Sequence, residues 1–563
     1  MTIWGWLQIA IAVAILILLV KPLGSYMHKV FEGQKTFLDP VIGPIQRVLF
    51  RFLGVDPEKE SSWSGYIIRL ILVDFALIFF GYVVVRLQGH LPLNPIGAPG
   101  MNPHIAFNTA VSFASNTNWQ VYAGETQASY LSQMMMMTAL MFTSAASGLV
   151  LAIAWMRGLS RRKTRNIGNF YADYVRAILR VFLPLALVLT LVLIPLGVIQ
   201  TLKGPARVQT LEGDTQQIPR GPVASLESIK HIGNNGGGFF NANSAHPFEN
   251  PNPLTNIILI MLMALIPLSL TYTLGRYLKE QRQGWVIFGA LLLLFLVFIG
   301  LTYYFEAGTS KELSGLGINT SAGNMEGKET RLGVAGSALF GAVTTSNTTG
   351  SVNSSHDSFT PMGGMMVMSA MMLNTVFGSS GAGMINIFMY VIFTVFIAGL
   401  MVGRTPEFRG KKIESREVKL SVLALLAHPL CILAFTAVAM ALPSVRAAIL
   451  NKGPHGISEV AYAFTSATAN NGSAFAGLAT SIPFLSVTTA IAMIVGRYVI
   501  FIPMMAVAGS LAQKQIVPES EGTFRTDNLL FAGLLIGIVI IIGALTFFPV
   551  LALGPLAEQF GVM

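Results

Sequence analysis

The stretch "KHIGNNGGGFFNANS", residues 230–244, decides the fold of this 563-residue chain. It joins two asparagines, three consecutive glycines and two phenylalanines, and it lies between apolar runs long enough to cross a lipid bilayer. Non-helical backbone survives at membrane depth only where protein buries it or where it lines a wet cavity, because lipid offers no hydrogen bonds. The stretch therefore predicts a pore or cavity within a membrane protein.

The composition is that of a membrane protein. Hydrophobic residues make up 53% of the chain and charged residues 11%, against roughly a quarter charged in soluble domains. The net charge of +10 is spread over short clusters between apolar runs, which indicates cytoplasmic loops and not a nucleic-acid-binding face. The one cysteine, Cys431, lies in an apolar run, so we interpret it as a small buried residue.

Ten apolar runs are long enough, at about 20 residues each, to span a bilayer. They lie near residues 3–21, 65–86, 130–156, 173–200, 253–275, 284–304, 358–402, 418–442, 480–509 and 529–553. The first run lacks a basic segment before it and a small-residue cleavage site after it, so we expect an uncleaved helix. The sequence predicts an all-α polytopic membrane protein with about ten transmembrane helices.

Positive charge predicts the orientation of these helices. The loops richest in lysine and arginine, 157–165, 276–282 and 404–419, each follow an odd-numbered span. Such loops stay on the cytoplasmic side. We therefore expect a multi-pass protein of the bacterial cytoplasmic (inner) membrane with both termini outside.

The segments after spans two, four, six and eight share one layout, a short apolar stretch followed by small polar residues and glycine. They read "HIAFNTAVSFASNTNWQ", "ASLESIKHIGNNGGGFF", "GVAGSALFGAVTTSNTTGS" and "ISEVAYAFTSATANNGSAF". Their central residues, Asn118, Gly236, Gly350 and Gly472, are 118, 114 and 122 residues apart. A near-constant period indicates internal repeats.

The repeat unit is a helix, a re-entrant half-helix with a polar loop, and a second helix. Four such units around a central pore account for eight spans, and the first and tenth spans are extra. The predicted repeats are 65–157, 158–278, 279–403 (with an interrupted second helix) and 404–510, between the flanking parts 1–64 and 511–563.

The loop composition suits a monovalent cation. Glycine permits left-handed backbone and close approach, so consecutive carbonyl oxygens can replace the water shell of an alkali ion. The carboxyl ends of the half-helices add partial negative charge. The loops lack the carboxylate ring or thiolate and histidine clusters typical of divalent or transition metals, which favours potassium first and sodium second.

Other motifs exclude nucleotide chemistry in this chain. Asn241 stands where a dinucleotide-binding fingerprint starting at Gly236 would need glycine, and "GRTPEFRGKK" (403–412) has the wrong spacing for a phosphate loop. We therefore do not expect the chain to hydrolyse ATP itself. Four histidines near the outer loops are expected to form hydrogen bonds and not to bind metal: His231, His246, His356 and His455.

Eight segments carry a resemblance to a known family: "NTNWQ", "NGGGFFNANSAHPFENP", "NMEGKE", "HDSFT", "IAGLMVGRTPE", "GKKI", "GPHG" and "NNGSAFAG". They resemble the potassium-binding, pore-forming subunit of the bacterial Kdp potassium-transporting ATPase, of the superfamily of potassium transporters. The resemblance implies high-affinity uptake of potassium as substrate, with no covalent cofactor. It also implies a P-type ATPase subunit that uses the ATP, and two small single-span subunits.

The resemblance implies the positions of the potassium filter. These are Asn116, Thr117, Asn118 and Gln120 in the first loop, Asn235, Gly236 and Gly237 in the second, Thr348, Thr349 and Gly350 in the third, and Asn471, Gly472 and Ser473 in the fourth.

The seventh apolar run is too long for one simple helix, and its centre, "NTVFGSSGAG" (374–383), contains helix breakers. Two separate spans would upset the orientation of everything downstream. The resemblance implies a gate on the inner path here, at Asn374, Gly378, Gly381 and Gly383. The best-known family member has glutamate where Asn374 stands, which puts a relay through that acid in doubt.

Arg404 and Arg497 lie near cytoplasmic ends of spans, where arginines usually anchor helices to the interface. The resemblance places Arg497 beneath the pore. Two other interpretations stay open, a passive channel or cation symporter of the same superfamily, and a structural membrane scaffold with vestigial loops.

Overall fold

The computed structural model describes residues 2–308, 315–317, 319, 321–401, 403, 405–518 and 524–561. Within these ranges ten helices are long and apolar enough to cross a membrane. They are α1 (Ile3–Phe31), α3 with η1 (Trp63–His90), η2 with α6 (Ser132–Ser160), α7 with η3 and α8 (Phe170–Leu193), α10 (Pro253–Leu278), α11 (Gln281–Glu306), α15 (Ala382–Met401), α16 (Ser415–Ala441), α19 with η6 and α20 (Pro483–Gln513) and α21 with η7 and α22 (Leu529–Gln559). The prediction of ten spans in an all-α membrane fold is confirmed.

The long seventh run is an interrupted helix. The short helix α14 (Pro361–Leu373) comes first, an irregular segment follows, and α15 is the spanning part. Asn374 ends α14 in the left-handed conformation, with φ 49°. Because only α15 is long enough to span, the number of spans agrees with the prediction.

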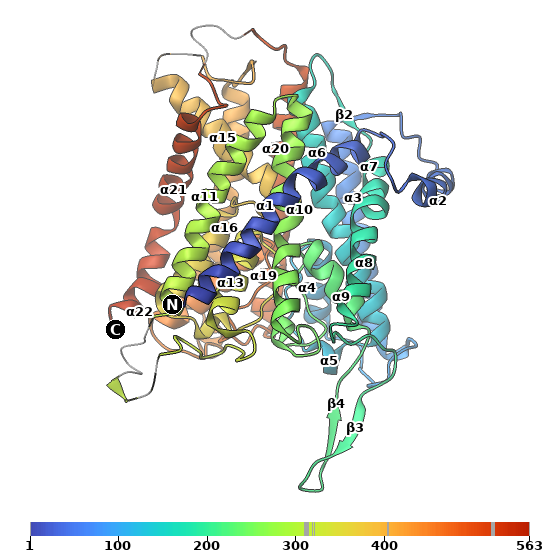
Figure 1. Ribbon diagram of the computed structural model, residues 1–563, viewed down its shortest axis with the longest axis vertical. Helices are drawn as coiled ribbons and strands as arrows, with labels where there is room; N and C mark the ends of the chain where they lie inside the picture. The colour runs from blue at the N-terminus through green and yellow to red at the C-terminus, as the bar shows by residue number, and fades with distance from the viewer. Residues whose placement is uncertain are drawn as a thin grey trace.

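Four further short helices precede the polar loops: α4 (Pro103–Ala114), α9 (Val223–Ile232), α13 (Gly333–Ser346) and α18 (Pro454–Thr468). Prolines at the first position of α4 and α18 suit helix starts, because the missing N–H has no intrahelical partner there. At 10 to 15 residues the four helices are too short to cross a bilayer. Of these, α4, α9 and α13 are labelled in the lower half of Figure 1.

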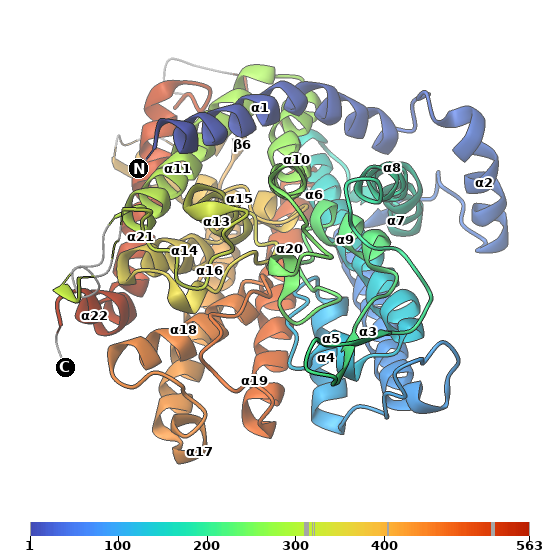
Figure 2. The same ribbon diagram turned by 60° about the horizontal axis from the view of Figure 1, so that its bottom comes forward.

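Figure 2 looks toward the lower end and shows α4, α9, α13 and α18 placed around one centre. The loops that follow them are named here loop 1 (residues 115–120), loop 2 (233–238), loop 3 (347–352) and loop 4 (469–474). Long spans surround this centre, and α1 lies along α10 on the outside (Figures 1 and 2).

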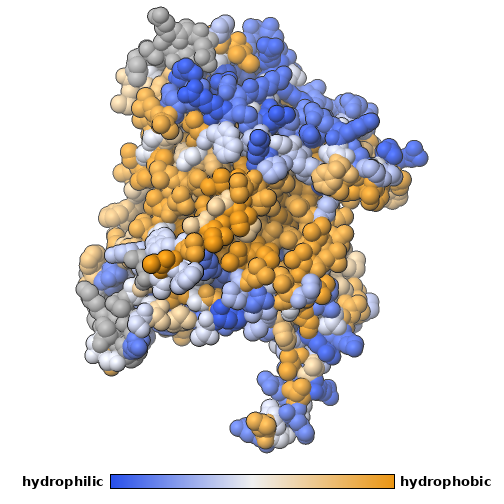
Figure 3. All heavy atoms as spheres, viewed as in Figure 1, coloured by the Kyte–Doolittle hydropathy of each residue, from blue (hydrophilic) through white to orange (hydrophobic). Residues whose placement is uncertain are grey.

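The surface agrees with a membrane setting. Figure 3 shows an apolar belt across the middle of the molecule between two polar ends. Both termini lie toward the same end, opposite to β2 (Asn166–Gly168) and α2 (Asp39–Phe52) in Figure 1.

Some small elements were not predicted. The helices among them are α2, α5 (Gly124–Gln127) and α17 (Pro443–Arg446). An antiparallel hairpin of β3 (Ala206–Gln209) and β4 (Thr215–Ile218) projects from the lower end of Figure 1. Two shorter antiparallel pairs join β1 (Ser61–Ser62) to β2 and β5 (Glu407–Phe408) to β6 (Lys411–Lys412).

Candidate functional site

All four loops leave their half-helices in the same way. Two residues beyond the end of each helix the backbone turns left-handed, and it does so again two residues later. The pairs are Asn116 (φ 67°) and Asn118 (55°), Asn234 (52°) and Gly236 (94°), Thr348 (44°) and Gly350 (89°), and Asn470 (54°) and Gly472 (101°). Asparagine and glycine tolerate this region best, which explains seven of these eight residues; Thr348 is β-branched and is the exception.

The residue between each pair folds back onto its own half-helix. Its amide donates to the carbonyl five residues earlier, and the same bond occurs in every loop. The bonds are Thr117 to Ser112 (3.0 Å), Asn235 to Lys230 (2.9 Å), Thr349 to Thr344 (2.8 Å) and Asn471 to Ser466 (2.9 Å). The four loops therefore have one backbone shape, as expected for internal repeats.

The loops close into a ring in chain order. A Cβ on Gly236 would overlap the carbonyl of Thr349 in loop 3, and one on Gly350 would overlap that of Asn471 in loop 4. A Cβ on Gly472 would overlap the carbonyl of Thr117 in loop 1. Glycine at these three positions lets neighbouring backbones touch.

Asparagine side chains tie the ring together. Asn116 Nδ2 donates to the carbonyl of Asn234 (2.8 Å), and Asn234 Nδ2 donates to Thr349 Oγ1 (2.8 Å). Asn470 Nδ2 donates to Thr117 Oγ1 (3.0 Å). These bonds hold loop 1 to loop 2, loop 2 to loop 3 and loop 4 to loop 1.

Gln120 joins the first two loops a second time. Its Nε2 donates to the carbonyl of Gly238, and its Oε1 accepts the amide of the same glycine, both at 2.9 Å. Asn118, the one non-glycine central residue, has side-chain oxygen and nitrogen atoms that are buried without a protein partner. Unpaired buried polar atoms call for an explanation such as an ion or water.

The structure brings all thirteen predicted filter residues to this ring, and all except Gln120 and Gly472 are buried. The carboxyl ends of the four half-helices converge on it, so their partial negative charges favour a cation. Neutral carbonyl, hydroxyl and amide oxygens are the donors available within loops 1 to 4. The arrangement suits a dehydrated monovalent cation.

The interrupted helix lies directly against the ring. Ser380 Oγ donates to Asn234 Oδ1 (2.6 Å), and the Gly378 amide donates to the Ser346 carbonyl at the end of α13 (3.2 Å). A Cβ on Gly378 would overlap Gly383, and one on Gly381 would overlap the backbone of Gly148 in α6. Three of the predicted gate residues, Gly378, Gly381 and Gly383, thus lie in a tight backbone crossing. The crossing is hydrogen-bonded to loop 2 through Ser380 and to the end of α13 through Gly378.

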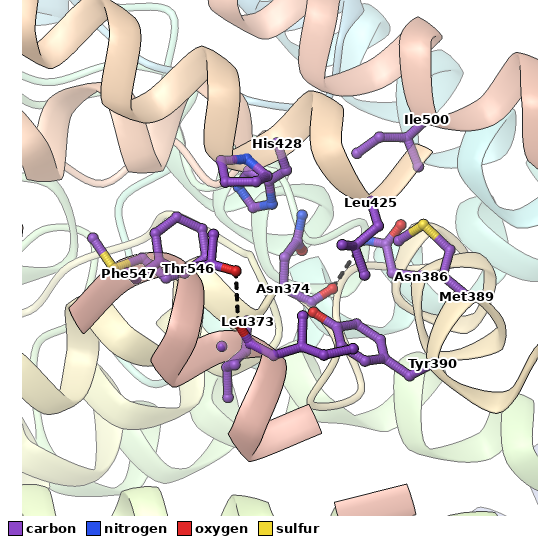
Figure 4. A pocket seen from close by; sticks show the side chains of 14 residues that line it. Leu373, Asn374, Asn386, Met389, Tyr390, Leu425, His428, Ile500, Thr546 and Phe547 are labelled. Carbon is purple, nitrogen blue, oxygen red and sulfur yellow. Dashed lines mark hydrogen bonds between the residues drawn. The ribbon is translucent and has the colours of Figure 1, made fainter. Parts of the chain in front are cut away.

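A small pocket lined by both polar and apolar side chains adjoins the start of this break (Figure 4). Asn386 Nδ2 donates to the Asn374 carbonyl (2.9 Å), while Asn374 Oδ1, Asn386 Oδ1 and His428 Nε2 have no protein partner. Leu425 and Thr546, from α16 and α21, line the same space. Three unpartnered polar atoms therefore lie on the flank of the interrupted helix, where α14 ends.

Arg497 is buried and is not an interfacial anchor. It is 2% exposed, and its guanidinium donates to the carbonyls of Ser115 (2.8 Å) and Ser144 (3.2 Å). Its Nε lies 3.5 Å from Asp74 Oδ2 in α3. The residue joins the end of the first half-helix to two spans. Arg404 lies outside the described residues.

Two charged clusters near the ring were not predicted from the sequence. Lys230 is buried between Glu227 and Glu249 behind loop 2. Two charged residues, Glu227 and Lys230, in a short helix predicted to enter the membrane could have indicated a buried ion pair. The third partner, Glu249, is 19 residues from Lys230. The partners did not follow from the sequence.

The second cluster surrounds His455, whose ring nitrogens bond Asp357 and Glu558, both at 2.9 Å. Asp357, His455 and Glu459 are close enough together to hold a metal ion. Burial alone would lower the pKa of His455, but the two carboxylate hydrogen bonds outweigh it and raise the pKa to about 10. Burial and the nearby Lys328 lower the pKa of His356 to about 3, so that ring is neutral.

Comparison with solved structures finds the same fold in a potassium transporter. TrkH from Vibrio parahaemolyticus superposes with a TM-score of 0.52 at 14% identity, covering 89% of this chain and 98% of that one. At this identity the likeness concerns the fold alone.

Comparison with known sequences covers the whole chain. Proteins named potassium-transporting ATPase potassium-binding subunit from Granulibacter bethesdensis and Alicyclobacillus acidocaldarius are 50% and 52% identical. The matches cover 100% and 99% of this chain and 99% of each relative. The family model described as KdpA, potassium-transporting ATPase A subunit, matches residues 10–560. With its ring of four loops and its full-length relatives, the chain belongs to the potassium-transporting ATPase A subunit family.

Proposed function

We propose that this protein binds, selects and translocates potassium ions from outside, as the pore subunit of an ATP-driven uptake complex. The observation that carries the proposal is the closed ring of loops 1 to 4, with the same left-handed pair in each. Full-length relatives named as potassium-binding subunits support potassium as the ion. Neutral oxygen donors suit potassium because it gives up its water more readily than a divalent cation does.

The energy for uptake comes from a partner. The relatives are named as subunits of an ATPase, and the nucleotide motifs considered in the sequence do not match this chain. We propose a P-type ATPase subunit that hydrolyses ATP and two small single-span subunits, in a complex of the bacterial inner membrane with both termini of this chain outside. The four repeats, 65–157, 158–278, 279–403 and 404–510, are proposed as its structural units.

Beneath the ring, the break of the interrupted helix is the proposed gate. Its left-handed residues include Asn374, Gly378 and Gly381, and Gly383 packs against the turn. We expect Gly381→Val to stall transport while potassium binding persists. Normal transport by this variant would contradict the assignment.

The test of the function is potassium-stimulated ATPase activity of the purified complex, measured against sodium and rubidium. We expect stimulation by potassium in the wild type and its loss in Gly236→Asp, since no side chain fits between loops 2 and 3 at this position. Stimulation unchanged in Gly236→Asp would remove loop 2 from the filter.

Co-purification separates the pump from a passive channel. A tagged chain is expected to bring down an ATPase subunit in stoichiometric yield from its native membrane. Isolation as a stable solitary homo-oligomer would support a channel or symporter instead.

A further inference from the structure

A buried ion-pair cluster lies behind loop 2. Lys230 Nζ contacts Glu249 Oε2 (2.6 Å), Ser244 Oγ (2.8 Å) and Glu227 Oε2 (2.9 Å). The side chains of Lys230, Glu227 and Glu249 are all 0% exposed. Placing charges where water cannot reach them is costly, so such a cluster needs every partner in place.

This lysine breaks the fourfold pattern. The carbonyl that receives the folded-back amide belongs to serine or threonine in the other three repeats, at Ser112, Thr344 and Ser466. Two of those hydroxyls bond their own loops, Ser112 Oγ to the Trp119 carbonyl and Ser466 Oγ to the Gly472 amide, both at 2.9 Å. Lys230 instead reaches past its loop to the segment beyond it.

Glu249 connects the cluster to loop 2. Its Oε1 accepts the Phe240 amide (2.8 Å). A Cβ on Gly238 would lie 2.8 and 3.0 Å from the two carboxylate oxygens, so the carboxylate rests on the loop backbone. The ammonium that holds Glu249 thereby fixes the outward course of loop 2.

Ser244 connects the same cluster to loop 3. Its hydroxyl lies 2.8 Å from Glu227 Oε1 and 3.0 Å from the hydroxyl of Ser351, the residue after Gly350. His231 Nε2 also lies 3.1 Å from Ser351 Oγ. The cluster therefore sets the separation between loops 2 and 3, where Gly236 and Gly350 touch.

We infer that Lys230, held between Glu227 and Glu249, is a positioning residue that sets the ion preference of the filter by fixing loop 2 and its spacing from loop 3. The inference rests on the proposed function and deepens it by assigning the ion preference of the filter to one residue behind loop 2. Lys230 acts on the ion only through the loops, because its ammonium is fully engaged behind them.

The experiment measures half-saturating concentrations of potassium, rubidium and sodium for ATPase stimulation of the purified complex. Lys230→Met keeps the length and bulk of the side chain and removes its charge. We expect the half-saturating potassium concentration to rise about tenfold, as for the loss of one well-placed interaction. The ratio of half-saturating sodium to potassium concentrations should then fall about tenfold. The maximal rate at saturating potassium is expected to persist, since the ATP-hydrolysing machinery is untouched.

Lys328→Met is the matched control. Lys328 is also a lysine with a fully buried, paired side chain, with Glu306 Oε2 at 2.7 Å, but its ion pair lies outside loops 1 to 4. This variant loses a comparable ion pair, so it should lower thermal stability while leaving the ion ratios as in the wild type. An equal fall of the sodium-to-potassium ratio of half-saturating concentrations in both lysine variants would overturn the inference, because general destabilisation would then explain the effect.

Glu249→Gln is the milder second variant and decides the matter if Lys230→Met fails to assemble. Glutamine can keep its oxygen on the Phe240 amide, but its NH2 then faces the Lys230 ammonium and that hydrogen bond is lost. Lys230 still has Glu227 and Ser244 as partners, so we expect the ratio of half-saturating sodium to potassium concentrations to fall only about threefold. If the ratio of half-saturating sodium to potassium concentrations stayed within about twofold of the wild-type value in every assembled variant, the positioning role of Lys230 would be refuted. A wild-type complex without potassium stimulation would instead refute the proposed function, whatever the variants do.

Discussion

The three consecutive glycines at 236–238 meet three different neighbours. Gly236 faces the backbone of loop 3, and Gly237 faces Asn118, whose Cβ would lie 3.0 Å from a Cβ added at Gly237. Gly238 faces the Glu249 carboxylate. Each glycine therefore has a separate close neighbour, and only Gly236 also favours glycine through its positive φ.

Substitution of Gly236 separates steric overlap from backbone strain. Gly236→Ala is expected to raise the half-saturating potassium concentration more than about tenfold, because its Cβ would push loop 3 away. The control is Gly213→Ala in the exposed hairpin turn, which has nearly the same φ (91° against 94°) but open space around it. Equal potassium dependence in the two variants would show that the crowding has no functional weight.

Asn118 and Gly237 form a complementary pair. Loops 3 and 4 have glycine and then serine at the matching positions (350–351 and 472–473), whereas loop 1 has Asn118 and loop 2 follows Gly236 with Gly237. We expect Gly237→Ser to cost about 1–3 kcal/mol through crowding against Asn118, and Asn118→Gly to recover part of that cost in the double variant. Thermal unfolding of the four purified complexes measures the coupling, and strictly additive costs would disprove it.

At the level of elements, Arg497 joins the ninth span (α19 with η6 and α20) to three other helices. It belongs to the π-helical segment η6 (Val495–Val499), and its partners lie at the end of α4, in α6 and in α3. A wider helical turn at a functional position is common, because it turns a side chain out of register. The guanidinium thereby reaches the carboxyl end of one half-helix.

Removing this guanidinium should leave Asp74 as an unpaired buried charge. Arg497→Met is expected to destabilise the complex by about 3–5 kcal/mol, with Arg497→Met/Asp74→Asn recovering part of the loss. Thermal unfolding of the two variants gives the comparison. If Asp74→Asn recovered no stability in the double variant, the ion pair between Arg497 and Asp74 (3.5 Å) would not contribute to the stability of the fold.

The elements were predictable where the chain repeats itself. Spans, half-helices and loop centres followed from apolar length and a near-constant spacing, and the structure has them at those places. Contacts between elements did not follow, since the partners of Lys230 and His455 depend on how distant segments pack. Exposed polar segments such as the β3–β4 hairpin have weak patterns, because no buried face selects their residues.

At the scale of the whole molecule, His455 links two segments that lie far apart in the sequence. It links Asp357, beyond loop 3, to Glu558 in the last helix, α22. These contacts hold α22 against the start of α18, which leads into loop 4. The imidazole thus adds a polar link to the packing of η7 and α22 against α14 and α18.

This link should depend on pH in a defined direction. The pKa of His455 rises from 6.5 when unfolded to about 10 when folded, so its stabilisation is complete below about pH 6.5 and is lost as pH rises through 10. We expect His455→Gln to abolish the part of the stability loss that appears between about pH 6.5 and 10 in thermal unfolding. His90→Gln, at an exposed position, is the control and should retain the wild-type profile.

The pairing of Asn118 with Gly237 has a consequence for the ancestry of the protein. If one gene segment was copied four times, the copies began with equal loops, and a bulky change in one could persist only with a reduction in its neighbour. A chimaera that exchanges repeat 1 or repeat 2 alone between relatives would therefore inherit only half of the pair formed by Asn118 and Gly237. Exchange of repeats 1 and 2 together keeps this pair intact and is the better route for recombination.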